Sequence, residues 1–363
     1  MSNKRKRVLV WMSGTDDVIN NAPNVAGFQV QMCFWALIFA RKGWNVYSFS
    51  KKRKGVLSGI HYIYHDVSKV CRKLHLTFLS TLAMYVKAFL VRPDYVFCRG
   101  FSNGLHWVTT ICRFLGVKTV FFGASDVNFI PGKELPTGDD SRTRNYRKGL
   151  KKVDYFVTQN EAQHGLLLSN YERDSIIIPN IWIPQDDVSN DDKKYDAVWV
   201  SNLRKLKRPE WFLDMATANP NSKYAMAGGG RLDKDFYDSV EQQASQIPNL
   251  DFLGPLSFNE VSKLMAKAKV VVCSSEFEGF PNTFLQAWSL SVPVVSTVDP
   301  SGVIERYSLG FYVQDKEEMI SKSQILANDK LLNHTMSENV NKYFISNHSA
   351  DNGYEKIIKL ILN

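Results

Sequence analysis

The stretch that decides the fold runs from Ser274 to Val295 and reads SSEFEGFPNTFLQAWSLSVPVV. A short run, VVVC at Val270–Cys273, comes directly before it and has the β-branched composition of a strand buried on both faces of a parallel sheet. An amphipathic helical pattern begins near Asn282. In open α/β sheets, ligands bind outside the carboxyl ends of strands, where the next helix offers unpaired N–H groups. The stretch therefore predicts an anion-binding loop.

Length and composition favour a globular protein of two domains. The chain has 363 residues, which is long for one hydrophobic core, and 44% of them are hydrophobic. Its five cysteines are odd in number and widely spaced, so we interpret them as reduced thiols of a cytoplasmic protein. No His/Cys cluster has metal-ligand spacing, so we expect no metal and no cofactor. The basic N-terminus is a poor signal peptide, and the apolar run 32–40 is too short to cross a membrane.

The positive charge is concentrated in the first part of the chain. Residues 1–150 contain 23 Lys and Arg against 8 Asp and Glu, a net charge of +15, whereas the whole chain has +9. Such asymmetry indicates either an anionic partner or a solvated basic surface.

Two series of strands alternate with helical patterns, which predicts two doubly wound parallel sheets. We expect an N-terminal domain over 1–184, a C-terminal domain over 195–344, and a terminal helical segment, 345–363, that packs back on the first domain. The two α/β domains are expected to face each other across a cleft. The triple glycine at Gly228–Gly230 is no full dinucleotide fingerprint and no phosphate-loop motif of nucleotide hydrolases occurs, which disfavours nicotinamide chemistry and ATP hydrolysis.

The chemistry of the loop suits a phosphorylated ligand. A helix that starts near Asn282 offers about half a positive charge at its N-terminus, and Asn282 or Thr283 could cap it. Glu278 could accept hydrogen bonds from sugar hydroxyls, although the residues alone favour an exposed loop carboxylate.

The same residues carry a resemblance to a known family. The stretch FEGFPNTFLQAWSLSVPVVST, together with YAMAGGGR, LDFLGPLS and IIIPNI upstream, resembles the retaining glycosyltransferases of the GT-B fold, glycosyltransferase family four, of the type found in bacterial polysaccharide biosynthesis. In that family a Glu-Gly-Phe loop is followed by a second Glu, whose place is taken here by Gln286. SNLRKLK at Ser201–Lys207 resembles the family's Gly-Arg-Leu segment, with Asn202 in the place of the Arg.

The resemblance implies roles for individual residues. Glu278 would contact the transferred sugar, Lys207 would bind the diphosphate, and Gln286 would stand at the ribose. Asp126 would contact the sugar or the acceptor; the alternative is that it only caps a helix. Gly27 would let the backbone approach an anion; the alternative is that it only serves a turn. The implied catalytic residues are Glu278, Lys207 and Asp126. The implied substrate-binding residues are Gly27, Asn202, Arg204, Gly279, Phe280, Pro281, Asn282, Thr283 and Gln286.

The resemblance implies a retaining, metal-independent hexosyltransferase that moves a sugar from a nucleotide diphosphate sugar to a glycan acceptor, lipid-linked, in surface polysaccharide synthesis. The alternatives are a nucleotide-sugar 2-epimerase of the same fold and a non-catalytic nucleotide-sugar-binding protein, to which Gln286 and Asn202 point. A basic helical stretch over 69–91, with Leu74, Phe78, Leu82, Tyr85 and Phe89, could lie on an anionic membrane, or else most of these apolar residues pack into the core of the N-terminal domain. We therefore expect peripheral attachment at the inner face of the cell membrane, and no nucleic acid partner.

Overall fold

The computed structural model describes most of the chain. The described residues are 6–20, 22, 25, 27–52, 55–65, 77–134, 140–184, 193–230, 233–278 and 280–362. Within them, no helix combines the length and the hydropathy needed to cross a bilayer. Of the residues singled out above, Gly279 and Leu74 lie outside the described part.

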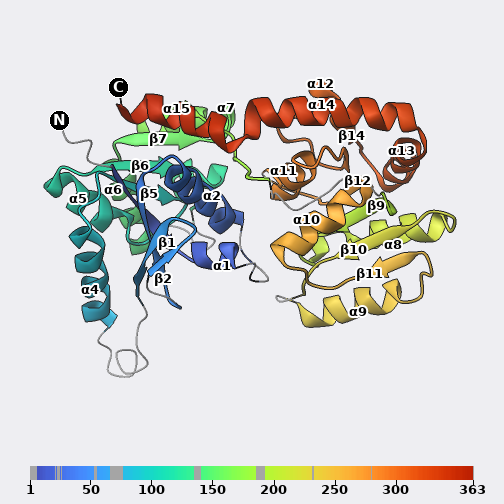
Figure 1. The fold of residues 1–363 in the computed structure, drawn as a ribbon, viewed down its shortest axis with the longest axis horizontal. Helices are drawn as coiled ribbons and strands as arrows, with labels where there is room; N and C mark the ends of the chain where they lie inside the picture. The colour runs from blue at the N-terminus through green and yellow to red at the C-terminus, as the bar shows by residue number, and fades with distance from the viewer. Residues whose placement is uncertain are drawn as a thin grey trace. The chain divides into compact units, whose positions relative to one another are not determined.

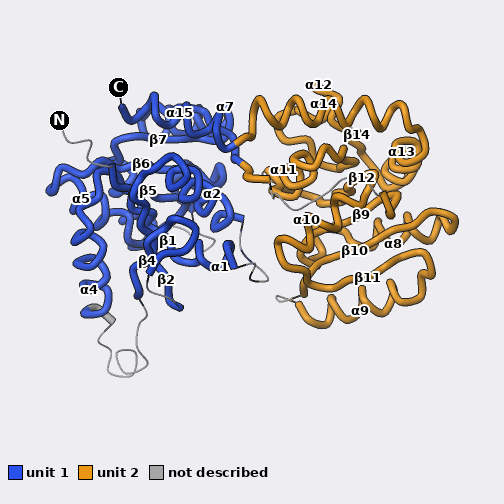
Figure 2. Tube along the Cα trace, viewed as in Figure 1, with its two compact units in different colours: residues 1–20, 25–181, 350–363 blue, residues 21–24, 182–349 orange. Residues whose placement is uncertain are grey.

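The chain forms two compact units (Figure 2). The first consists of residues 1–20, 25–181 and 350–363, and the second of residues 21–24 and 182–349. From the sequence we expected the boundaries between the two domains to lie at 184–195 and at 345.

The first unit is built on an eight-stranded sheet in the order β3-β4-β2-β1-β5-β6-β7-β8 (Figure 1). All neighbouring strands are parallel except the β3–β4 pair. The chain starts at the centre with β1, builds outward through β2 and β4, and returns to add β5 on the other side. This doubly wound order has a switch point between β1 and β5.

The first unit's strands are β1 (Arg7–Ser13), β2 (Asn45–Ser50), β3 (Gly55–Leu57), β4 (Ile60–Tyr64), β5 (Tyr95–Arg99), β6 (Lys118–Phe122), β7 (Tyr155–Thr158) and β8 (Ile176–Ile177). Its helices are α1 (Thr15–Ile19), α2 (Gly27–Arg41), α4 (Thr77–Leu90), α5 (Leu105–Leu115), the 3-10 turn η1 (Asp126–Phe129), α6 (Ser141–Leu150), α7 (Glu161–Tyr171) and α15 (Ala350–Leu362).

The second unit repeats the plan with six parallel strands in the order β11-β10-β9-β12-β13-β14. Its strands are β9 (Tyr195–Val200), β10 (Tyr224–Ala227), β11 (Leu250–Phe252), β12 (Ala268–Cys273), β13 (Val294–Ser296) and β14 (Gly310–Tyr312). Its helices are η2 (Lys205–Lys207), α8 (Pro209–Ala218), α9 (Lys234–Ala244), α10 (Phe258–Ala266), α11 (Asn282–Trp288), η3 (Pro300–Gly302), α12 (Val303–Tyr307), α13 (Lys316–Asn328) and α14 (Lys330–His348).

Each sheet has its own hydrophobic core. In the first unit the core includes Leu9 and Phe121, and in the second it includes Trp199 and Val272, all buried. The central strands are β-branched and apolar on both faces, which is the composition expected for parallel strands covered on both sides. The four described cysteines are buried free thiols.

Helix α4 shows both of the arrangements considered for the basic helical stretch. Tyr85 and Phe89 pack against the core of the first unit. Leu82 is exposed, in one row with Leu79, Val86 and Leu90. The apolar residues occur nearly all round this helix, so spacing alone could not tell which row is buried.

Gly228 allows the ends of β9 and β10 to approach closely. A Cβ at this position would lie 1.8 Å from the carbonyl oxygen of Ser201. The backbone N–H of Ser201 donates to the carbonyl of Ala227, and that of Gly228 donates to the carbonyl of Gly254. The three strand ends are therefore tied together just beyond the sheet, where a side chain would not fit.

We predict that Gly228→Ala lowers the free energy of unfolding by ~2–3 kcal/mol, because the backbone must shift to admit the methyl group. Gly165→Ala is the control, since Gly165 lies inside α7 and a Cβ added there would meet no atom within 4 Å. That change should stabilise by about 0.5–1 kcal/mol. Chemical denaturation measures both. Equal stability of Gly228→Ala and the unmodified protein would contradict the steric account.

Candidate functional site

The candidate site lies at the switch point of the second sheet, between β9 and β12. These two strands pair in parallel near the centre of the sheet, with Val272 opposite Trp199. The chain leaves β9 toward β10 on one side and leaves β12 toward β13 on the other. The segments that follow the two strands, η2 and the loop 274–281, therefore start at the crevice where ligands of such sheets bind.

Ser274 joins the two strand ends. Its side chain is completely buried. Its hydroxyl oxygen accepts a hydrogen bond of 3.0 Å from the indole N–H of Trp199 and lies 2.7 Å and 2.9 Å from the carbonyl oxygens of Lys207 and Arg208. The N–H of Glu276 also donates to the carbonyl of Leu206. The loop after β12 and the turn after β9 are thus one connected structure.

This connection brings two predicted catalytic residues together. Lys207 and Glu278 are 71 residues apart in the sequence, yet the ammonium group of Lys207 is paired with the carboxylate of Glu278. Their side chains are 11% and 23% exposed, so most of the pair is removed from water. A partly buried pair of this kind is costly to break from one side, because the remaining charge loses its partner.

Hydroxyl groups that sequence analysis missed hold the loop in place. Ser275 donates to the carboxylate of Glu278 at 3.1 Å. Thr297, just after β13, donates to the carbonyl of Ser275 at 2.7 Å. Ser and Thr are common in loops for many reasons, so only their position directly after buried strands could have signalled this role.

The turn η2 adds further positive charge next to Lys207. Arg204 and Lys205 are exposed, and the guanidinium of Arg208 stacks over the ring of Trp211 at 4.9 Å. Arg208 also lies 3.8 Å from Glu276, which neutralises part of its charge. Asn202, the residue in the place of the family's Arg, is exposed immediately before this turn. The segment can therefore offer several cations to an anionic ligand, with Lys207 the most buried of them.

The helix after the loop differs from the expectation in its cap. Helix α11 covers Asn282–Trp288, as the pattern predicted, but its N-cap is Pro281 and no side chain caps it. The prediction that Asn282 or Thr283 caps the helix was wrong, because both residues already lie inside its first turn. Phe280 packs against Trp288 and His348, with ring centroids 6.0 Å and 5.2 Å away.

Gln286 is turned toward the protein interior. It is 5% exposed, and its amide donates to the hydroxyl of Ser262 at 2.7 Å and to the carbonyl of Phe258 at 3.2 Å. These bonds fasten α11 to α10. The amide group at the place of the family's second Glu is thus already used for packing two helices together.

Two further predicted residues lie in the first unit. Gly27 is the first residue of α2 and is exposed. Asp126 is exposed at the start of η1, after β6. The cap of this turn is Ser125, which forms a reciprocal capping arrangement with Asn128, so the interpretation of Asp126 as the capping residue was wrong. Among the described residues, no three His, Cys, Asp or Glu side chains cluster as a metal site would require.

Comparison with known proteins gives the site a family context. Residues 194–329 match the family model described as "Glycosyl transferases group 1". The chain is 26% identical over 172 residues to glycosyltransferase 1 domain-containing protein 1 of Xenopus tropicalis, covering 46% of this chain and 50% of that protein. It is 26% identical over 217 residues to the Vi polysaccharide biosynthesis protein VipC/TviE of Salmonella typhi, covering 56% and 35%. The chain thus spans half or less of the length of these curated relatives.

Solved structures establish the fold. The crystal structure of Anabaena Alr3699/HepE in complex with UDP-glucose superimposes with a TM-score of 0.69 at 13% identity, covering 98% of this chain and 99% of that one. The predicted GT-B fold, with two Rossmann-like α/β domains, is confirmed by this likeness and by the two doubly wound sheets.

We predict that Gln286→Ala lowers the free energy of unfolding by about 1–3 kcal/mol, because Ser262 and Phe258 lose a buried partner. Gln286→Glu should destabilise the protein as well, since a carboxylate cannot donate to the Phe258 carbonyl. Gln243→Ala, on the exposed side of α9, should have almost no effect. Denaturant titration compares the three variants, and a Gln286→Glu protein as stable as the unmodified chain would rule out this packing role.

Proposed function

We propose that the protein is a retaining glycosyltransferase that moves a sugar from a nucleotide diphosphate donor to a hydroxyl of a glycan acceptor. The observation that carries the proposal is the pairing of Lys207 with Glu278 at the switch point of the second sheet. This pair lies inside the region that matches the glycosyltransferase family model, residues 194–329. A related fold is known with UDP-glucose bound.

In the proposed mechanism the donor separates the ion pair. The ammonium of Lys207 binds the diphosphate and offsets the negative charge that grows on it as the glycosidic bond breaks. Glu278 is then free to accept hydrogen bonds from hydroxyls of the transferred sugar, with Ser275 still oriented toward its carboxylate. Arg204 and Lys205 are exposed cations close to Lys207 in the sequence that can add to the phosphate site. The charge needed for catalysis is therefore supplied by side chains.

Lys207→Ala should lower kcat by a factor on the order of 10²–10³, the usual effect of removing one group that stabilises developing negative charge. Glu278→Gln should lower kcat as well. A carboxylate has two oxygens that accept hydrogen bonds from sugar hydroxyls, whereas an amide has only one and places a donor where the second would be. The measurement is turnover of a panel of nucleotide diphosphate sugars, with proton NMR of the product anomer to show retention.

Lys234→Ala is the matched control, since Lys234 is an 82% exposed lysine on α9 of the same unit. Unchanged turnover in both Lys207→Ala and Glu278→Gln would mean that the site is wrong. Release of an epimerised free sugar without an acceptor would favour the 2-epimerase instead. Tight nucleotide binding without any turnover would favour the non-catalytic protein, which the inward-facing Gln286 amide motivates.

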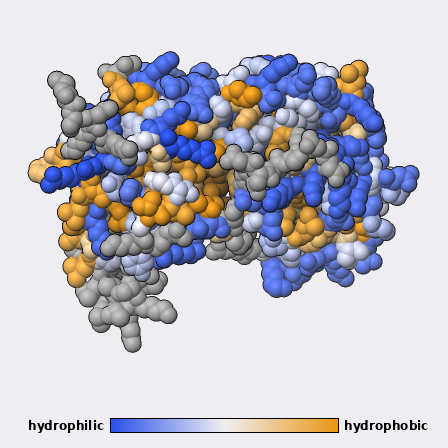
Figure 3. Space-filling model, in the orientation of Figure 1, coloured by the Kyte–Doolittle hydropathy of each residue, from blue (hydrophilic) through white to orange (hydrophobic). Residues whose placement is uncertain are grey.

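We propose further that the acceptor is lipid-linked and that the protein works at the inner face of the cell membrane, in surface polysaccharide synthesis. An exposed apolar surface on the first unit supports this. It consists of the α4 row together with Trp107, Phe114 and Leu115 of α5, and Leu90 and Phe114 are 72% and 88% exposed. Figure 3 shows apolar side chains gathered over α4 and α5.

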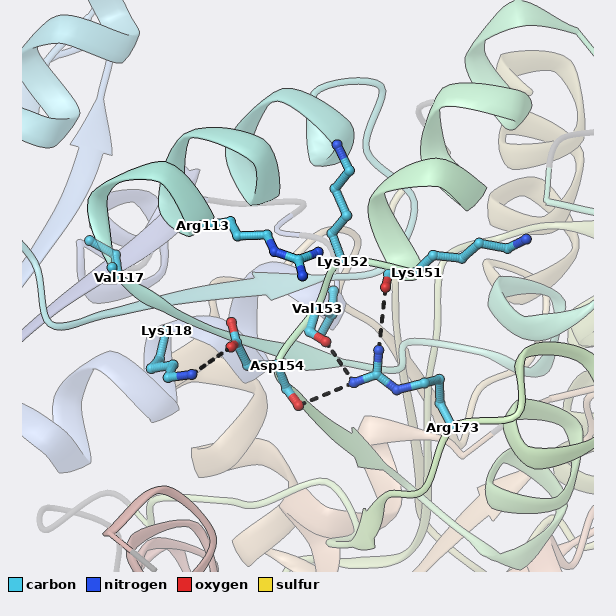
Figure 4. A pocket seen from close by; sticks show the side chains of 9 residues that line it. Arg113, Val117, Lys118, Lys151, Lys152, Val153, Asp154 and Arg173 are labelled. Carbon is cyan, nitrogen blue, oxygen red and sulfur yellow. Dashed lines mark hydrogen bonds and ion pairs between the residues drawn. The ribbon is translucent and has the colours of Figure 1, made fainter.

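The charge around this surface is complementary to anionic lipid. Helices α4, α5 and α6 contain no Asp or Glu, whereas α6 has four cations. Two of them, Arg142 and Arg147, are paired with Asp140 and Glu134, and the other two, Arg144 and Lys148, are exposed. Beyond the C-terminal end of α5, a pocket at the amino edge of the sheet is lined by Arg113, Lys118, Lys151, Lys152 and Arg173 (Figure 4). Its carboxylate, Asp154, is paired with Lys118 at 3.0 Å. Each cation near an anionic surface adds about 1 kcal/mol to membrane binding.

The double change Leu82→Asp and Val86→Asp should reduce binding to vesicles containing phosphatidylglycerol about tenfold, because it places charge in the apolar row. Vesicle flotation at low and high salt measures it, with Leu331→Asp, a 76% exposed leucine on α14 of the second unit, as the control. Salt-insensitive binding, or equal flotation of the double variant and the control, would contradict the membrane proposal.

A further inference from the structure

Arg99 occupies the switch point of the first sheet. It is the last residue of β5, which pairs in parallel with β1, and the last bonded pair is Val10 with Phe97. The chain leaves β1 toward β2 on one side and leaves β5 toward β6 on the other. By the same topological argument that placed Lys207 and Glu278, the carboxyl end of β5 is a ligand-binding position.

The guanidinium of Arg99 is buried without a carboxylate. Arg99 is 9% exposed, and among the described residues no Asp or Glu forms an ion pair with its guanidinium. One Nη donates to the amide oxygen of Asn180 at 2.8 Å, while the buried Nε has no hydrogen-bond partner. Burial lowers the pKa of this guanidinium. Arginine remains protonated at neutral pH, so the first unit contains a desolvated positive charge that no Asp or Glu of the described residues neutralises.

A purely structural role does not account for this arrangement. A buried cation with a single neutral partner and an unpaired donor costs stability, and an apolar residue of similar volume would serve the core better. Arginine presents several donors in a planar fork that matches a carboxylate or a phosphate. An oxyanion would supply both the charge and the acceptors that Arg99 lacks.

We propose that Arg99 binds an oxyanion of the acceptor, so that the acceptor substrate is a phosphorylated or carboxylated glycan. This inference rests on the proposed glycosyltransferase function, because it assigns the first unit's switch point to the acceptor and the second unit's to the donor. The shared chemistry is a planar or tetrahedral oxyanion. It can come from a lipid diphosphate or from an acidic sugar.

Calorimetric titration with pyrophosphate tests the site. The unmodified full-length chain should show two binding events. Arg99→Met should lose one of them, with an affinity at least tenfold weaker, and Lys207→Ala should lose the other. Pyrophosphate binding to Arg99→Met that equals binding to the unmodified chain would overturn the proposal. Loss of one event in Arg99→Met, with none lost in Lys207→Ala, would keep the Arg99 site and reject the proposed donor site.

Stability separates a binding role from a structural one. Arg99→Met should melt at the same temperature as the unmodified chain or higher, since a desolvated charge is removed at nearly constant volume. Arg99→Lys keeps the charge without the planar fork and should recover only part of the affinity. A fall in melting temperature for both variants, together with unchanged pyrophosphate binding, would identify Arg99 as a structural residue only.

Two probes identify the source of the oxyanion. Geranyl diphosphate represents a lipid-linked acceptor, and methyl glucuronide represents an acidic sugar. Binding of the diphosphate alone that is lost in Arg99→Met assigns a phosphorylated acceptor, whereas Arg99-dependent binding of the glucuronide alone assigns an acidic glycan. If the affinity of neither probe depends on Arg99, the proposal fails. In transfer assays, Arg99→Met should raise the KM for the acceptor and leave that for the donor unchanged.

Discussion

The candidate site depends on the buried hydroxyl of Ser274. It bonds to the indole of Trp199 in β9, which belongs to the core of the second unit, and to the backbone of Lys207 and Arg208 in the turn after that strand. Because Ser274 itself directly follows β12, its hydroxyl ties the loop after β12 to β9 and to the turn after β9. The position of the ammonium of Lys207 relative to the carboxylate of Glu278 follows from this constraint, and so does any chemistry that needs both groups at one ligand.

The two units share one sheet topology but carry different charged groups at its switch point. Both sheets begin at the centre and build outward in two directions, so each has a switch point at the carboxyl ends of its two central strands. At the switch point of the second unit lies a pair of opposite charges, Lys207 and Glu278. At that of the first unit lies Arg99, whose guanidinium donates to the neutral amide of Asn180. A protein that joins two substrates can use one switch point for each.

The sequence predicted the fold well, because buried parallel strands have a strong pattern. The strand expected at Val270–Cys273 is the second part of β12, and both doubly wound parallel sheets are present. The resemblance to a known family singled out Glu278 and Lys207 as site candidates but not their pairing, which depends on a fold that joins residues 71 positions apart. The structural roles of Ser274 and Gln286 could not be predicted, because hydrogen bonds to residues on other helices and strands leave no periodic pattern in the sequence.

The proposed function requires that the second switch point bind the diphosphate of a sugar donor. Hydrogen exchange measured by mass spectrometry, with and without a panel of nucleotide diphosphate sugars, tests this binding most directly because it reports on many segments of the chain at once. We expect slower exchange in two segments, 201–208 and 274–287, with a donor that binds. Protection confined to other segments, or none in these two while a donor measurably binds, would contradict the proposed function.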